Sequence, residues 1–194
     1  MTNDRYQAAE HVAFHRSPAE LQAGLAEVAA APKDAGTLAL VVRRPGVGER
    51  EVLDVGVLDP AVGLVGDTWN VRSSTRTPDG SPHPDMQLNV MSSRAVALVA
   101  TVPERWALAG DQLYVDLDLS PENLPPGTQL AIGSAVIEVT DQPHRGCATF
   151  AERFGVEALR FVNSPEGSAL RMRGINAKVV RAGEVRPGDT VTKR

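Results

Sequence analysis

The chain is poor in cysteine and in aromatic residues, and each scarcity excludes a class of function. Its single cysteine, Cys147, cannot form an intramolecular disulfide, which favours a reducing, cytoplasmic location. Aromatic residues make up only 4% of the chain, so stacking platforms for single-stranded nucleic acid are not expected. The net charge of -4 gives no electrostatic reason to bind nucleic acid, and no apolar stretch approaches the length of a membrane span. We therefore expect a cytoplasmic protein with neither nucleic-acid nor membrane partners.

The beginning of the chain predicts a helix. Ser17, Pro18 and Glu20 form a capping-box pattern with proline at the first helical position, and an apolar stripe at helical spacing follows from Leu21 until Pro32 ends it. The rest of the chain shows no linker or internal repeat. We assign two parts, an N-terminal helical extension over residues 1–36 and one domain over residues 37–194.

Many short strands with a few helices are predicted along this domain. Residues 37–44 and 51–57 form an expected hairpin, and a long polar loop over 71–85 carries Arg72, Arg76 and His83. Further strands are expected over 86–91, 113–119, 129–132, 135–140 and 175–181, and helices over 93–101, 148–154 and 156–161. This pattern predicts a mainly β, barrel-like fold.

Cys147 lies between a strand and a helix. The alternating run 136–139 ends at Pro143 and Gly146, and Phe150 begins an amphipathic pattern shortly after the cysteine. A thiol at a helix start, with His144 and Arg145 as possible added positive charge, favours the thiolate that attacks electrophiles and ligates metals. The alternative is that Cys147 is a small buried structural residue.

Two other chemistries fit Cys147 less well. His144 and Cys147 have a spacing that suits two metal ligands, and Asp141 or His83 could add a third, but a structural zinc site needs four and no second cysteine exists. A Cys-His pair for acyl transfer lacks any accompanying hydrolase signature.

An ordered series of short motifs resembles the MOSC domain, the module named for the C-terminal part of molybdenum-cofactor sulfurases. The series consists of Gly63-Leu-Val-Gly66-Asp67, Gln87 to Arg94, Gly110-Asp111-Gln112, Pro126-Gly127 to Gly133, Cys147, Arg173-Gly174, and Gly183 to Asp189. Two positions depart from the family pattern, since Asp111-Gln112 stands for Glu-Asn and Gly146 stands for the usual proline before the cysteine.

The resemblance implies a β-barrel like that of the pyruvate kinase barrel domain, a molybdenum cofactor and a molybdenum-ligating cysteine. In characterised relatives this site reduces N-hydroxylated compounds, and other members carry sulfur for cofactor assembly. No domain for pyridoxal phosphate and no flavin or iron–sulfur motif is visible, so electrons for a reductase would come from a partner protein.

The resulting hypothesis is a molybdenum-dependent reductase of small N-hydroxylated substrates, in which Cys147 is both the catalytic residue and the metal ligand. The alternatives are a persulfide carrier and a non-catalytic binding module with a structural Cys147. We expect guanidinium groups near the cysteine to hold the cofactor phosphate. The candidate cofactor-binding residues are Asp67, Arg94, Asp111, Gln112, His144, Arg145, Arg171 and Arg173.

Overall fold

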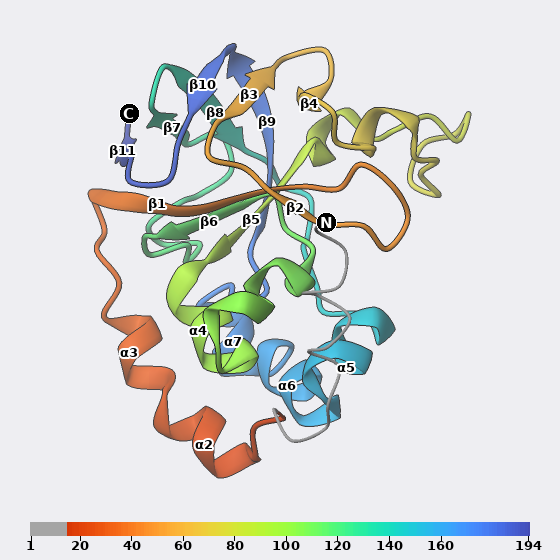
Figure 1. The fold of residues 1–194 in the computed structure, drawn as a ribbon. Helices are drawn as coiled ribbons and strands as arrows, with labels where there is room; N and C mark the ends of the chain where they lie inside the picture. Colours follow the sequence, from red (N-terminus) through yellow and green to blue (C-terminus); the bar gives the residue numbers. More distant parts are fainter. Residues whose placement is uncertain (1–14) are drawn as a thin grey trace.

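Seven strands of the computed structural model, which describes residues 15–194, close a mixed barrel (Figure 1). In order around the barrel they are β11 (Thr190–Lys193), β7 (Gln129–Ile132), β8 (Ala135–Val139), β9 (Ile175–Arg181), β5 (Leu88–Ser92), β6 (Leu113–Asp116) and β1 (Ala35–Arg43). The sheet closes because β1 pairs with β6 on one side and with β11 on the other. Only β5 and β6 run parallel among these pairs of described strands. The expected β-rich barrel is confirmed.

Four short strands complete or extend the barrel. The hairpin expected from residues 51–57 forms only in part, because β2 (Glu51–Val52) pairs with β1 and the chain then leaves the barrel. The remainder enters a second sheet made of β10 (Gly183–Val185), β3 (Gly56–Asp59) and β4 (Gly63–Leu64).

The barrel interior is filled by aliphatic side chains. Alternating residues of the strands point inward, as shown by the fully buried Leu38, Val90, Val115, Ile137 and Ala177. Alternation in the sequence produces this arrangement because successive strand residues face opposite sides of the sheet. The interior is therefore a packed core, which leaves the ends and rims of the barrel for a site.

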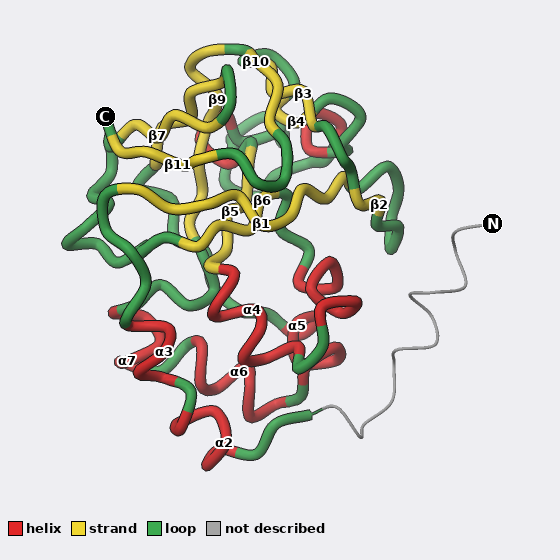
Figure 2. The backbone as a smooth tube through the Cα atoms, turned by 60° about the vertical axis from the view of Figure 1, so that its left-hand side comes forward, coloured by secondary structure: helices red, strands yellow, loops and turns green. Residues whose placement is uncertain are grey.

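Short helices gather at one end of the barrel (Figures 1 and 2). They are α2 (Pro18–Ala23), α3 (Leu25–Ala29), α4 (Ser93–Ala100), α5 (Ala148–Phe154), α6 (Val156–Val162) and α7 (Pro165–Ala169). The capping box of Ser17 and Glu20 is present, and the first predicted helix is divided at Gly24. Leu21 is fully buried in a second hydrophobic cluster that includes Phe150 and Phe154 of α5. Among residues 15–194, no helix is both long enough and apolar enough to cross a membrane.

Gly174 sets how closely β9 begins beside β5. Its φ of 104° lies in the region that favours glycine, and a Cβ at this position would collide with the carbonyl oxygen of Val90. The close approach places Arg173, the preceding residue, under the loop that carries Cys147.

Candidate functional site

Cys147 is exposed and begins a helix, as the sequence predicted. It is the N-cap residue of α5, and its carbonyl oxygen accepts hydrogen bonds from the amides of Phe150 and Ala151. The segment 140–147 connects β8 to α5 and forms the loop that we call the Cys147 loop. Because Cys147 is exposed, the expectation of a small buried residue was wrong, whereas the alternative of a non-catalytic binding module remains open.

Asn163, which caps the end of α6, holds the Cys147 loop. The Gly146 amide donates to Oδ1 of Asn163 at 3.0 Å, and Nδ2 of Asn163 donates to the Gly146 carbonyl at 3.2 Å. A Cβ at residue 146 would lie 2.7 Å from Cδ1 of Leu159 and 3.1 Å from Cγ2 of Val162. Glycine therefore allows the loop to pack directly against α6.

A cavity of about 240 Å³ is lined by residues 140–145 of this loop, and we call it the Cys147 cavity, although Cys147 itself is not among the residues that line it. Its lining includes Gln142, His144, Arg145, Asn163, Arg171 and Arg173. Arg145 is exposed and makes no hydrogen bond or ion pair with residues 15–194. Arg171 instead donates from Nη1 to the carbonyls of Leu119 and Leu124. Arg145 is thus the more available of these two cations.

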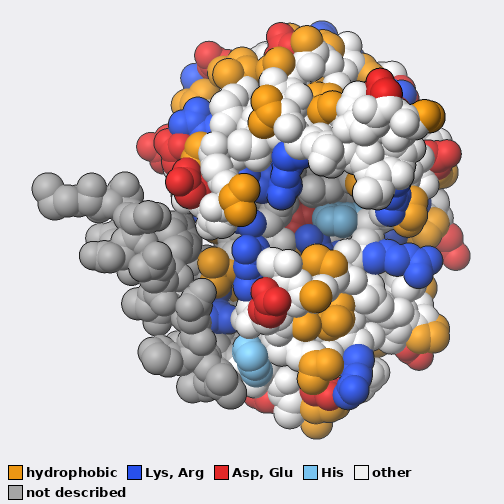
Figure 3. Space-filling model, turned by 90° about the vertical axis from the view of Figure 1, so that its right-hand side faces the viewer, with side chains coloured by type: hydrophobic (Ala, Val, Ile, Leu, Met, Phe, Trp, Pro, Cys, Tyr) orange, Lys and Arg blue, Asp and Glu red, His pale blue; other side chains and the backbone are white. Residues whose placement is uncertain are grey.

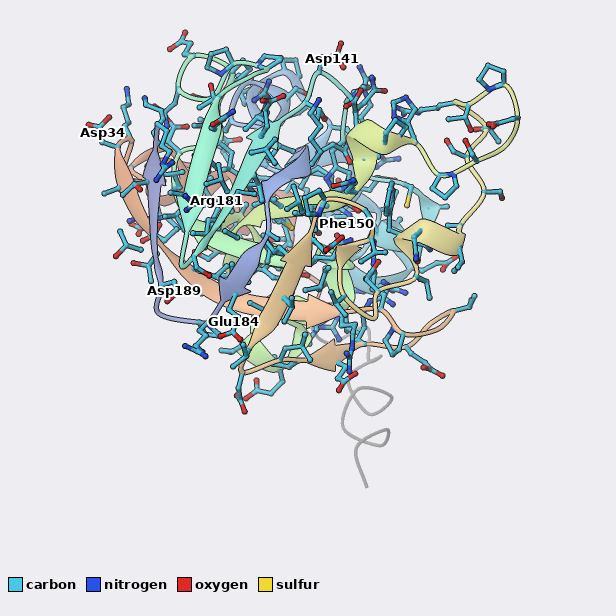
Figure 4. All side chains as sticks on the ribbon, turned by 90° about the horizontal axis from the view of Figure 1, so that it is seen from above. Asp34, Asp141, Phe150, Arg181, Glu184 and Asp189 are labelled. Carbon is cyan, nitrogen blue, oxygen red and sulfur yellow. The ribbon has the colours of Figure 1, made fainter. Side chains whose placement is uncertain are left out.

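A buried ion pair lies beneath the Cys147 cavity. Nη1 of Arg173 donates to both carboxylate oxygens of the fully buried Asp111, at 2.9 and 2.7 Å, and Nη2 donates to the Ala109 carbonyl. Nε of Arg173 is buried and has no hydrogen-bond partner. The Arg173 guanidinium lies 5.2 Å from the ring centroid of the buried Phe150, which is labelled in Figure 4. The helix that follows Cys147 is thereby attached to the ion pair.

His144 is neutral in this site. Burial lowers its pKa well below 6.5, and the positive charges of Arg173, Arg44 and Arg76 lower it further. Its Nδ1 lies 3.5 Å from Oδ1 of Asp111 without a hydrogen bond. Burial raises the pKa of Asp111, and Arg173 opposes that effect. The expectation that His144 adds positive charge near Cys147 was therefore wrong.

A second buried ion pair joins Arg44, at the end of β1, to Asp67. The Arg44 side chain donates to Asp67 at 2.8 Å from both Nε and Nη2. The amides of Arg44 and Trp69 and the side chain of Gln112 also donate to this carboxylate. Gln112 in turn accepts from the Asn89 amide. The structure thus gives Asp67 and Gln112 partners inside the protein.

Asparagines connect the Arg44–Asp67 ion pair to the Cys147 loop. Nη1 of Arg44 donates to Asn89, whose Nδ2 donates to Oδ1 of Asn176 at 2.7 Å. Asn176 then donates to the Gln142 carbonyl in the Cys147 loop. Nη1 of Arg76, in the predicted polar loop, also donates to the Gln142 side chain. Segments distant in the sequence therefore meet at one site.

Positive charge is concentrated here. Burial, followed by the charges of Arg153 and Arg44, lowers the pKa of Arg50 to about 10. Burial and the charge of Arg44 lower the pKa of Arg72 as well. Figure 3 shows Lys and Arg side chains around a hollow on this face. Such a surface favours anionic ligands.

The structure brings together most of the predicted site residues but not Arg94. His144, Arg145, Arg171 and Arg173 line the Cys147 cavity, and Asp111 lies beneath it. Arg94 lies on α4, where it pairs with Asp116 and Glu27, and it is not part of the cavity lining. Sequence reasoning missed Arg44 and Asn163, because neither stands in a recognisable motif.

No three His, Cys, Asp or Glu side chains within residues 15–194 form a group that could hold a metal ion.

The model of the MOSC domain matches residues 79–192, which is more than half of the chain, and the chain belongs to this family. The crystal structure of YuaD from Bacillus subtilis is similar, with a TM-score of 0.56 and 19% identity over 82% of this chain and 95% of that one. YiiM from Escherichia coli is also similar, with a TM-score of 0.51 and 20% identity over 81% of this chain and 69% of that one. These similarities show the shared fold. A search of curated proteins gave no match.

Proposed function

We propose that the chain binds the molybdenum cofactor through Cys147 and reduces N-hydroxylated compounds. The observation that carries this proposal is an exposed thiol on a loop that forms one wall of an arginine-lined cavity. Family membership supports it, because MOSC domains are associated with this cofactor.

The residues present fit the cofactor. A thiolate is a soft ligand that suits molybdenum, and Cys147 is accessible to it. The cofactor phosphate requires cations, and Arg145 lacks a partner within residues 15–194 while Nε of Arg173 is buried without one. Both arginines line the same cavity. A phosphate there would satisfy donors that the protein leaves unpaired.

The proposed reaction is R–NH–OH + 2 e⁻ + 2 H⁺ → R–NH₂ + H₂O, in which the N–O bond breaks and its oxygen leaves as water. The bound cofactor would supply the two-electron redox centre. The protein would hold it with Cys147 and orient its phosphate with Arg145. A partner protein would supply the electrons. Burial, with the charges of Arg173 and Arg44, lowers the pKa of His144 well below 6.5, so protons would come from solvent or substrate rather than from an imidazolium at this position.

A persulfide carrier is the second candidate, favoured by the same exposure of Cys147. In this function Cys147 would bear a sulfane sulfur and pass it to an acceptor, without retaining molybdenum.

Cys147→Ser distinguishes these functions. Protein would be produced in a host that makes the cofactor, and molybdenum content, intact mass and viologen-driven reduction of an N-hydroxylated aromatic amine would be measured. We expect molybdenum and activity in the wild type and in Thr149→Ala, an exposed control on α5, and neither in Cys147→Ser. A persulfide mass on Cys147 without molybdenum would favour the carrier. Wild type with neither molybdenum nor persulfide would contradict both.

A further inference from the structure

A second cavity has a volume of about 310 Å³. It is linked to the Cys147 cavity by the hydrogen bonds that join Asn89 through Asn176 to Gln142. Its lining includes Arg44, Trp69, Arg72, His83, Met86 and Asn89, and we call it the Trp69 cavity. Two of these residues, Arg44 and Asn89, belong to the hydrogen-bonded chain that ends at Gln142 in the Cys147 loop. The two cavities are therefore neighbours joined through one network.

The charges of the Trp69 cavity are unbalanced. The charge of Arg44 is paired with Asp67, but the guanidinium of Arg72 makes no hydrogen bond or ion pair with residues 15–194. Among the described residues, none with a carboxylate lines this cavity. Burial and the nearby charge of Arg44 both disfavour the charged form of Arg72, as the lowered pKa of Arg72 indicates. An anion bound between these cations would relieve that repulsion.

The other walls suit a flat ring. Trp69 and Met86 provide apolar surface, and the Trp69 ring packs against Gly63, with Cε3 3.7 Å from where a Cβ of residue 63 would lie. The Trp69 amide donates to Asp67, so the residue that anchors Arg44 also positions the tryptophan. Nδ1 of His83 accepts from the Asp85 amide, which leaves Nε2 as the protonated nitrogen and a potential donor.

We propose that the Trp69 cavity binds a small organic anion, a flat ring bearing one carboxylate or phosphate. Arg72 pairs with the anionic group, and Trp69 packs against the ring. The binding of such an anion does not depend on the proposed function. The further statement that the Trp69 cavity anchors the substrate does rest on the proposed function. The substrate class would then be acid-bearing aromatic compounds whose reacting nitrogen extends toward the Cys147 loop.

Trp69 offers a direct reporter of this binding. The chain has two tryptophans, and Trp106→Phe would leave Trp69 as the only one. Phenyl phosphate and benzoate would be titrated into this full-length variant, with benzyl alcohol and benzamide as neutral counterparts and fluorescence as the readout. We expect saturable changes in fluorescence with the two anions. Added salt should weaken this binding, and Arg72→Ala should weaken it by at least about tenfold. Arg72→Lys should weaken binding less, because it keeps the charge but loses the bidentate fork.

Arg160→Ala is the matched control, because this exposed arginine on α6 pairs with Glu157 and with no other residue in 15–194. It should bind both anions as the parent does. Equal binding of neutral and anionic compounds, unchanged binding in Arg72→Ala, or no saturation with either anion would overturn the proposal. Loss of molybdenum from Arg72→Ala would also overturn it, because Arg72 would then hold the cofactor. If anion binding holds but no reductase activity exists, the proposed function fails and the binding site stands.

Discussion

The side chain of Asn163 accepts a hydrogen bond from the amide of Gly146 and donates one to the carbonyl of Gly146, one residue before Cys147. Many members of this family have proline at the position of Gly146, which would fix the loop covalently but has no amide hydrogen to donate. Here a Cβ at residue 146 would lie only 2.7 Å from Cδ1 of Leu159, so a larger residue would require Leu159 to move, and the hydrogen bonds of Asn163 hold the loop instead. The position of the thiol therefore depends on a residue at the end of the next helix.

Asn163→Ala should loosen the Cys147 loop while leaving the fold intact. Two hydrogen bonds are lost, each worth about 1 kcal/mol in net stability, and Asn163 is exposed. We expect faster amide exchange at Gly146 and a lower molybdenum content than in the wild type. The exchange rate and molybdenum content of Asn163→Asp should lie between those of the wild type and Asn163→Ala, because aspartate keeps the acceptor for the Gly146 amide and loses the donor. Unchanged exchange at Gly146 in Asn163→Ala would show that packing alone positions the loop.

Asp67→Ala should destabilise the protein strongly. The change leaves the buried charge of Arg44 without its partner, which typically costs roughly 3–5 kcal/mol in the free energy of unfolding. The control is Glu51→Ala, which removes the partly exposed partner of Arg43 and should cost less than about 1 kcal/mol. Urea unfolding measures both. A stable Asp67→Ala protein that fails to bind the cofactor would support the prediction from the sequence that Asp67 is a cofactor-binding residue.

The stability of the protein should fall as the pH falls below about 6.5, partly because of His144. The unfolded chain binds a proton at His144 near that pH, whereas the folded protein, in which the pKa of His144 is well below 6.5, does not. Between the pKa of His144 in the folded protein and its pKa in the unfolded chain, this one group reduces the free energy of unfolding by up to about 1.4 kcal/mol for each pH unit that the pH falls. His144→Gln should show a shallower loss in urea unfolding between pH 7 and pH 5.

The comparison between wild type and His144→Gln isolates this histidine. Arg173, Arg44, Arg76 and Asp111 face His144, and all four are present in both proteins. Burial raises the pKa of Asp111, which acts in the opposite direction as the pH falls, but this contribution is common to both proteins. Parallel stability curves would mean that folded His144 takes up a proton as readily as the unfolded chain does.

Local patterns in the sequence predicted elements with a clear period better than the contacts of the site. The bounds of β7, β9 and α5 match their predictions, because alternation or helical spacing extends through each. The strands β4, β10 and β11 were missed, since two to four residues show no clear period and are paired by the surrounding fold. For the same reason Cys147 could be found from its motif, but its partner Asn163 could not.

Arg145→Ala should weaken cofactor binding more than any other single replacement among the arginines predicted from the sequence. Arg171 and Arg173 are occupied by carbonyls and by Asp111, and Arg94 is paired with Asp116. Arg145 is exposed in the lining of the Cys147 cavity and has no partner within residues 15–194. Loss of a charged hydrogen bond to the phosphate should cost roughly 1.5–3 kcal/mol in binding.

Titration of the isolated pterin cofactor into each variant measures this difference. Arg145→Lys should restore part of it, and Arg94→Ala, the matched control, should bind as the wild type does. If Arg145→Ala binds equally well, the phosphate lies against other cations, and Arg173 with its unpaired Nε becomes the first to replace.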